Sequence, residues 1–210
     1  MKKIALYLLL ILPGCNFINQ TLQSPKFVTI GSQNASQTWI YLCGLVHNFN
    51  PYQMNELKIL DAIGQELNIK ILAVIPHQRC AQYNNFLCWP HNDKNESVDT
   101  YQEIMKTIHT EIHGYIGFSQ GGFFLIQLAQ YIPINKPIIV IGAAGKINNT
   151  QGPSNKINLL IGQQDQWHYE HAINLYKQSK NTNLTIDLIE YSGGHEIPTN
   201  TLKNILKRFV

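Results

Sequence analysis

A serine between glycines, set between two apolar runs, constrains the fold of this chain more than any other feature. The hexapeptide Gly-Phe-Ser-Gln-Gly-Gly at residues 117–122 follows the apolar run 112–116 and precedes the apolar run 123–129. The first run has the length and composition of a buried strand, and the second is typical of a buried helix. Glycine two residues to either side of Ser119 permits the close backbone approach of a sharp strand-to-helix turn. A serine at the tip of such a turn faces the helix N-terminus, which favours developing negative charge, so we predict that Ser119 is a nucleophile.

Apolar runs on both sides of this turn predict the rest of the architecture. Strands are expected at residues 37–43, 69–75, 137–141, 157–161 and 184–191, with a short edge strand at 27–30. Helices are expected at residues 54–67, 101–112, 169–179 and 202–209, where apolar side chains recur at helical spacing. Such alternation indicates an α/β fold with a mostly parallel sheet and helices on both faces. Residues 76–96 form the longest stretch without a regular pattern, and loops of this length are often functional.

The N-terminus resembles an export signal. Lys2 and Lys3 precede an apolar run at residues 4–12 that is too short to span a bilayer. Leu-Pro-Gly-Cys at residues 12–15 is similar to the lipobox of bacterial lipoprotein leaders and predicts lipidation of Cys15. Ordinary secretion and an uncleaved apolar tail are the alternatives. We expect a leader at 1–14, a linker at 15–26 and one globular domain at 27–210, anchored by lipid in the bacterial cell envelope, in the periplasm or at the outer membrane.

Export bears on the remaining cysteines. Cys80 and Cys88 lie in the 76–96 stretch, close enough in sequence to form a disulfide in an oxidising compartment. Two free thiols are the alternative. Cys43 ends an apolar strand and is expected to be a small buried residue.

The carboxyl ends of parallel strands meet at one edge of a sheet, and this rule selects the partners of Ser119. A serine hydroxyl is a weak nucleophile until a base takes its proton, and the base needs an acid to orient it. His195 lies just past the last predicted strand, whereas His168 and His171 fall at or within a predicted helix. We therefore predict that His195 is the base.

Chain order selects the acid, because it falls between the serine and the histidine in folds with this kind of turn. Asp165 comes three residues after the apolar run that ends at Gly162. Asp187 lies inside a predicted strand, and Glu190, near that strand's end, is a weaker candidate for the acid. Asp165 is the predicted acid.

Two backbone N–H groups are expected to bind an oxyanion beside the serine. One belongs to Gln120, the residue after the nucleophile. The other comes from the loop after the strand at residues 37–43, where Leu45 is the expected donor.

Four short segments together resemble the phospholipase/carboxylesterase family of α/β-hydrolases, which includes acyl-protein thioesterases and bacterial carboxylesterases. They are the hexapeptide at 117–122, Cys-Gly-Leu at 43–45, Gly-Gln-Gln-Asp at 162–165 and Gly-His-Glu-Ile at 194–197. The resemblance covers about residues 39–210. It implies a single-domain α/β-hydrolase without a large cap domain, and it places Trp89 on a substrate-binding loop. The chain departs from the family at Trp167 and His168, which replace a common Val-Pro after the acid.

The leading functional hypothesis is a serine hydrolase that cleaves carboxylic or thio esters through an acyl-enzyme. Its partners would be small-molecule or lipid acyl esters and, through the lipid anchor, a membrane. A serine peptidase or amidase with the same three residues is the alternative enzyme. A non-catalytic binding lipoprotein is the third reading, and its usual sign would be a missing catalytic residue.

No cofactor, metal or nucleic acid is expected from the sequence. The formal net charge is +3, which does not indicate a nucleic-acid surface. His109 and His113 have the i, i+4 spacing of helical zinc ligands, but they stand in His-Thr-Glu-Ile-His rather than His-Glu-x-x-His, and no third ligand suggests itself.

Overall fold

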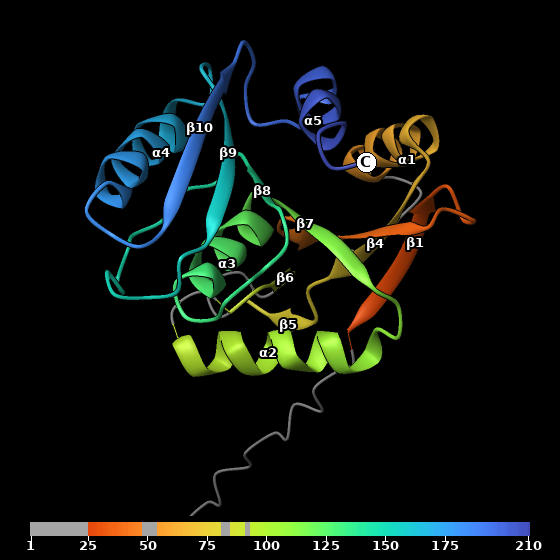
Figure 1. The fold of residues 1–210 in the computed structure, drawn as a ribbon, viewed down its shortest axis with the longest axis horizontal. Coiled ribbons are helices and arrows are strands. Elements are labelled where there is room, and N and C mark those ends of the chain that lie inside the picture. The colour runs from red at the N-terminus through yellow and green to blue at the C-terminus, as the bar shows by residue number, and fades with distance from the viewer. Residues whose placement is uncertain (1–24, 48–53, 81–84, 91–92) are drawn as a thin grey trace, which may run out of the picture.

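The computed structural model describes residues 25–47, 54–80, 85–90 and 93–210 (Figure 1). The predicted leader at residues 1–14, the lipidation site Cys15 and all but the last two residues of the predicted linker lie outside these ranges. Export and the lipid anchor therefore stay predictions. Within the described ranges, no helix combines the length and the apolar composition that crossing a membrane requires.

A seven-stranded sheet forms the centre of the molecule (Figure 1). The strand order is β1-β4-β2-β7-β8-β9-β10, and every neighbouring pair is parallel except β1 with β4. The strands are β1 (Lys26–Gly31), β2 (Gln37–Leu42), β4 (Ile69–Ile75), β7 (Ile112–Phe118), β8 (Ile138–Ile141), β9 (Lys156–Gly162) and β10 (Thr185–Tyr191). All four residues of β8, in the interior of the sheet, are buried. The central strands are apolar along their length because both faces of the sheet are covered.

Helices cover the two faces of this sheet (Figure 1). On one face, α1 (Asn55–Leu67) and α5 (Thr199–Leu206) pack their apolar stripes into one core cluster. On the other face, α2 (Lys94–Thr107), α3 (Gln120–Ala129) and α4 (Gln166–Ser179) pack into a second cluster. The predicted single α/β domain, with a mostly parallel sheet between two helical layers, is confirmed.

Helix α2 ends earlier than the apolar periodicity predicts. Its C-cap residue, Ile108, has an extended backbone (φ −97°, ψ 118°), and the chain then enters β7 at Ile112. Consequently His109 and His113 do not share a helix, which corrects the i, i+4 arrangement expected for them. His113 lies in β7, where its Nδ1 accepts a hydrogen bond from the backbone N–H of Thr38 at 3.3 Å.

The described residues between 76 and 96 include more regular structure than the sequence predicts. Two short strands, β5 (Gln78–Arg79) and β6 (Phe86–Cys88), pair antiparallel, and β6 also pairs with β3 (Val46–His47). A disulfide joins Cys80 and Cys88, whose Cα atoms are 5.2 Å apart. This three-stranded sheet ties the loop after β4 to the loop after β2.

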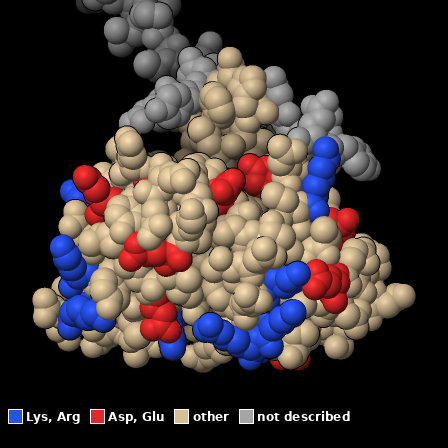
Figure 2. All heavy atoms as spheres, turned by 90° about the horizontal axis from the view of Figure 1, so that it is seen from above, with Lys and Arg blue, Asp and Glu red and all other residues tan. Residues whose placement is uncertain are grey.

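Charged side chains are interspersed on the face that Figure 2 shows. Lysine and arginine groups lie mainly toward the left and lower edges of this view, aspartate and glutamate groups lie near them and across the middle, and most of the surface is uncharged. An extended area of one sign is the feature that attracts nucleic acids or acidic surfaces, and this face does not present one.

Candidate active site

Ser119 sits at the tip of the turn between β7 and α3 with a strained backbone. Its φ is 52° and its ψ is −121°, in a region that residues with a side chain rarely adopt. The turn is held by the Ser119 backbone N–H, which donates to the carbonyl of Ile141 at 2.9 Å. A Cβ on Gly117 would lie 2.6 Å from the carbonyl oxygen of Gly121, and a Cβ on Gly121 would overlap the carbonyl of Leu42. Both glycines are therefore required for the chain to turn this sharply.

The three predicted catalytic side chains come together in one chain of hydrogen bonds. The Ser119 hydroxyl lies 3.0 Å from Nε2 of His195, and the His195 Nδ1 lies 2.7 Å from Oδ2 of Asp165. A carboxylate can only accept, so Nδ1 of His195 carries the proton and Nε2 is free to accept from the serine. This is the arrangement in which an imidazole can take the serine proton.

Ser119 and Asp165 each occupy the N-cap position of a helix, yet neither side chain caps it. Ser119 precedes α3 and Asp165 precedes α4, and neither side chain accepts a capping hydrogen bond from a backbone N–H of the helix that follows it. Serine and aspartate are preferred N-caps because they usually accept such bonds. Here both side chains turn to His195 instead. The N-terminal end of α4 also favours the negative charge of the Asp165 carboxylate.

Loop contacts after β10 fix His195 in place. The hydroxyl of Tyr191 lies within hydrogen-bonding distance of the carbonyl oxygens of Gly194 (2.9 Å) and Glu196 (2.8 Å). Gly142, with φ +56°, leaves room for the imidazole, because a Cβ there would lie 3.0 Å from Nδ1 of His195. The His195 side chain is 35% exposed, so the base is held by its surroundings and still open to a substrate.

A second histidine, His168, which was not among the predicted site residues, also binds the Asp165 carboxylate. Nδ1 of His168, in the first turn of α4, lies 2.8 Å from Oδ1 of Asp165. The His168 ring stacks on the His195 ring, with centroids 4.3 Å apart and planes 14° from parallel. The available signal was the spacing of His168, three residues after the acid at the start of a helix, which places both side chains on one side of the first turn.

Both histidines affect the charge of Asp165. Burial alone would raise the pKa of Asp165, but the hydrogen bonds from His168 and His195 outweigh burial and lower it below the ordinary value of 3.8. Burial is also the main cause that lowers the pKa of His168, although its bond to Asp165 opposes this. At neutral pH the site therefore holds an ionised carboxylate beside a neutral His168.

The two other carboxylates considered for the acid point elsewhere. Glu190 accepts hydrogen bonds from the Tyr169 hydroxyl at 2.6 Å and from Nε2 of Gln163 at 3.3 Å. Asp187 pairs with Lys156 at 2.8 Å on the surface. Asp165 is the one of the three that has His195 as a partner.

The segments predicted to supply the oxyanion donors both lie beside Ser119. Gln120 is the first residue of α3, where backbone N–H groups have no partner within the helix. Gly44 follows β2 so closely beside the serine that a Cβ on it would lie 3.2 Å from the Ser119 Cβ. Leu45 is the next residue, and its side chain is exposed. The two donors stay predictions, supported by this placement.

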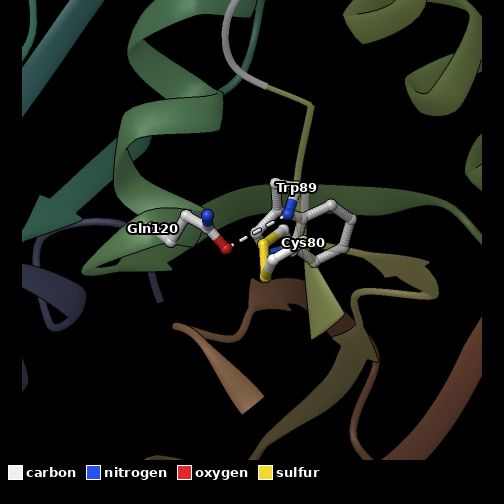
Figure 3. The surroundings of a disulfide bond; sticks show 4 residues. Cys80, Trp89 and Gln120 are labelled. Carbon is white, nitrogen blue, oxygen red and sulfur yellow. Dashed lines mark hydrogen bonds between the residues drawn. A yellow bond between two sulfur atoms is a disulfide. The ribbon is translucent and has the colours of Figure 1, made fainter. Parts of the chain in front are cut away.

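Trp89 does not have the surface that its predicted role requires. It is 1% exposed, and its ring stacks on Phe124 with centroids 5.0 Å apart. Its indole N–H donates to the carbonyl of Cys43 at 2.6 Å, and its backbone N–H donates to Oε1 of Gln120 at 3.1 Å (Figure 3). A buried side chain has no surface to offer a substrate, so we correct the predicted substrate contact. Trp89 instead links the hairpin of β5 and β6, which the Cys80–Cys88 disulfide closes, to the end of β2 and to the start of α3.

Asp165, His168 and His195 also form the one cluster of potential metal-ligating side chains found among the described residues. One ligand atom from each lies within 4.8 Å of the others. These atoms already bond to one another, through both oxygens of Asp165. A cation would have to break the hydrogen bonds that orient His195, so we assign no metal to the cluster.

The third cysteine, Cys43, is buried and free, and burial raises the pKa of its thiol.

The fold and this site define an α/β-hydrolase with a serine at the strand-to-helix turn. A model of the serine hydrolase family FSH1 matches residues 40–205, which is most of the chain. The chain therefore belongs to the serine hydrolase (FSH1) family and is an esterase-like enzyme. No curated protein matches the sequence significantly.

Several solved structures share the fold. The carboxylesterase from Mesorhizobium loti is 12% identical, with a TM-score of 0.64 over 89% of this chain and 96% of that chain. Acyl-protein thioesterase 2 from Zea mays is 17% identical, with a TM-score of 0.59 over 87% of this chain and 98% of that chain. The capsule O-acetyltransferase of Neisseria meningitidis serogroup A is 16% identical, with a TM-score of 0.60 over 89% and 91%. At these identities the likeness shows the fold alone, and the three proteins are named for different reactions.

Proposed function

We propose that this protein hydrolyses carboxylic or thio esters through an acyl-enzyme on Ser119, with His195 as the base and Asp165 as its acid partner. The observation that carries the proposal is the unbroken chain of hydrogen bonds from the serine hydroxyl to the carboxylate. The membership in the serine hydrolase family supports it.

Each residue has a definite step in this reaction. His195 takes the Ser119 proton at Nε2 as Oγ attacks the acyl carbon, and Asp165 stabilises the imidazolium that forms. The backbone N–H groups of Gln120 and Leu45 receive the oxyanion. The imidazolium then protonates the leaving alcohol or thiol. In the second half, His195 activates a water that releases the acid from Ser119.

Exposed apolar side chains near the site favour an apolar acyl group. Four large apolar side chains are exposed among the described residues, and two of them, Leu45 and Trp167, border the site. Leu45 follows Gly44, which lies against Ser119, and the Trp167 ring contacts the His168 ring at 4.5 Å. Small-molecule sites are lined mainly by apolar and aromatic side chains, so these two are available to contact an apolar acyl group.

The test compares labelling and turnover in wild type and Ser119→Ala. A fluorophosphonate probe should label the wild type, and the substitution should abolish both labelling and hydrolysis of p-nitrophenyl esters. Acyl chains of increasing length and a set of peptide amides in the same assay separate an esterase from the alternative peptidase. We expect esters to be cleaved and amides to be resistant.

The exposed Ser154, in the connection between β8 and β9, gives a matched control. Ser154→Ala should label and turn over like the wild type. Undiminished ester hydrolysis by Ser119→Ala would refute the proposed nucleophile. Faster cleavage of amides than of esters would instead favour the peptidase.

A further inference from the structure

The carboxylate of Asp165 is shared by two imidazole rings. Its Oδ2 accepts from Nδ1 of His195 at 2.7 Å, and its Oδ1 accepts from Nδ1 of His168 at 2.8 Å. The side chain is 7% exposed, and it makes no capping bond to α4. Each carboxylate oxygen therefore accepts one imidazole N–H, Oδ1 from His168 and Oδ2 from His195. Together the two hydrogen bonds fix the plane of the carboxylate.

His168 is itself held firmly. It belongs to the first turn of α4, its side chain is 17% exposed, and its ring contacts the rings of His195 and of Trp167. The titratable groups that act on it are Asp165, His195 and, along its own helix, His171. Because a carboxylate only accepts, Nδ1 of His168 must carry the proton in the bond to Oδ1.

The parallel stack of the two rings bears on the charge that catalysis creates. When His195 takes the serine proton it becomes a cation, and its ring is 4.3 Å from that of His168. A protonated His168 would repel that cation, whereas a neutral His168 does not. A neutral ring that donates one N–H to the carboxylate can thus orient Asp165 without opposing the imidazolium.

We propose that His168 is a positioning residue of the active site, which holds Asp165 through Oδ1 so that Oδ2 remains aligned with His195. This inference rests on the proposed function. The site is then a Ser-His-Asp-His arrangement in which the second histidine touches no substrate and acts through the acid. Loss of His168 should lower kcat, because His168 keeps Asp165 and His195 aligned in the transition state and does not contact the bound ester.

Two substitutions separate the hydrogen bond from the ring. His168→Phe keeps an aromatic ring for the stack but cannot donate to Asp165. His168→Asn removes the ring but can place an amide N–H near the position of Nδ1. We expect His168→Phe to lower kcat about 10- to 100-fold with little change in KM, since small misplacement of a catalytic group has effects of this size. His168→Asn should retain kcat within about threefold of wild type.

The pH profile and proton NMR add readouts that a purely structural role would not move. Without the His168 donor, the carboxylate stabilises the His195 imidazolium more strongly, so the acid limb of kcat/KM should move to higher pH in His168→Phe and stay in place in His168→Asn. The wild type should show two low-field imidazole N–H signals, His168→Phe one of them, and Asp165→Asn neither.

The outcomes distinguish this inference from the proposed function. If the wild type neither labels with fluorophosphonate nor cleaves esters, the proposed function fails. If the wild type is active and His168→Phe matches it in kcat and acid limb, the role of His168 is overturned alone. Equal losses in the Phe and Asn variants would also overturn it, because the ring and not the donor would then matter. Circular dichroism and the labelled fraction report whether each variant is folded.

Discussion

Asp165 and Glu190 are both carboxylates at the carboxyl ends of neighbouring strands, and their partners separate them. Asp165 is buried and receives N–H bonds from two imidazoles, whereas Glu190 is exposed and receives the Tyr169 hydroxyl. Hydrogen bonds lower the pKa of each, but only the Asp165 carboxylate is placed to stabilise a charge on His195. The identity of the acid is therefore a matter of geometry more than of ionisation.

Substituting the two carboxylates separately tests this assignment. Asp165→Asn should reduce kcat by about 10³- to 10⁴-fold, because an amide facing His195 favours the wrong tautomer and removes the charge that stabilises its imidazolium. Glu190→Gln should leave kcat unchanged within about twofold, since its partners lie on the surface. Steady-state kinetics on one p-nitrophenyl ester is sufficient. A crippled Glu190→Gln beside a nearly silent Asp165→Asn would reverse the assignment.

At the residue scale, chain order and strand ends predict which side chains the fold brings together, and their catalytic roles stay predictions. Ser119, Asp165 and His195 all follow parallel strands, so the rule that such sites lie beyond the carboxyl ends brings them together. His168 was set aside because a histidine inside a helix has no preferred partner in the sequence. The apolar pattern predicts that this helix begins at residue 169, and the i, i+3 relation of Asp165 and His168 follows only from its actual start at Gln166.

At the scale of elements, the hairpin of β5 and β6, which the Cys80–Cys88 disulfide closes, is linked through Trp89 to the two segments that should bind the oxyanion. Figure 3 shows the link to Gln120. Trp89 follows β6, and its two N–H groups donate to the side chain of Gln120 and to the carbonyl of Cys43. Cys43 precedes the Gly44–Leu45 turn, and Gln120 opens α3. The Cys80–Cys88 bridge closes a short ring around this hairpin, for which chain-entropy models give about 2–3 kcal/mol.

Weakening the hydrogen bonds that Trp89 makes to Cys43 and Gln120 should affect kcat more than KM. Trp89→Phe keeps a ring to stack on Phe124 but removes the indole N–H that binds Cys43. We expect kcat to fall about 10-fold while KM changes less than about twofold, because misplaced oxyanion donors weaken transition-state binding.

A double Cys80→Ser, Cys88→Ser variant should reduce kcat in the same sense. Phe86→Leu, between the two cysteines of the same hairpin, is the matched control and should have a smaller effect on kcat. An increase in KM at constant kcat in Trp89→Phe would contradict this account and return Trp89 to substrate binding.

The elements that the sequence predicts best are those whose pattern is continuous. Strands β4 and β8 match their apolar runs because buried parallel strands carry apolar side chains on both faces. Helix α2 ends before the predicted residue 112 because Ile108 and Ile112 continue its apolar spacing while lying in a loop and in strand β7. Strands β5 and β6 are two and three residues long, too short for any periodicity to identify.

At the scale of the whole molecule, buried histidines couple stability to pH. Burial lowers the pKa of His77 and of His168 below the ordinary value of 6.5. The unfolded chain therefore binds more protons than the folded protein as the pH falls below about 6.5, and the free energy of unfolding falls with it. Asp165, whose pKa is lowered from 3.8, weakens the fold only at still lower pH.

His77 lets this coupling be tested away from the active site. It is 8% exposed, and neither ring nitrogen has a hydrogen-bond partner among the described residues, although Nε2 lies 3.8 Å from Glu103.

His77→Leu has similar volume and nothing to protonate, so its urea midpoint should decline less than that of wild type between pH 7 and pH 5, with little change at pH 7.5. The exposed His109 supplies the control, and His109→Gln should retain the wild-type decline. Urea unfolding at several pH values, followed by tryptophan fluorescence, measures the slope. An unchanged slope in His77→Leu would mean that the loss of stability in acid comes from His168 and the other titrating groups.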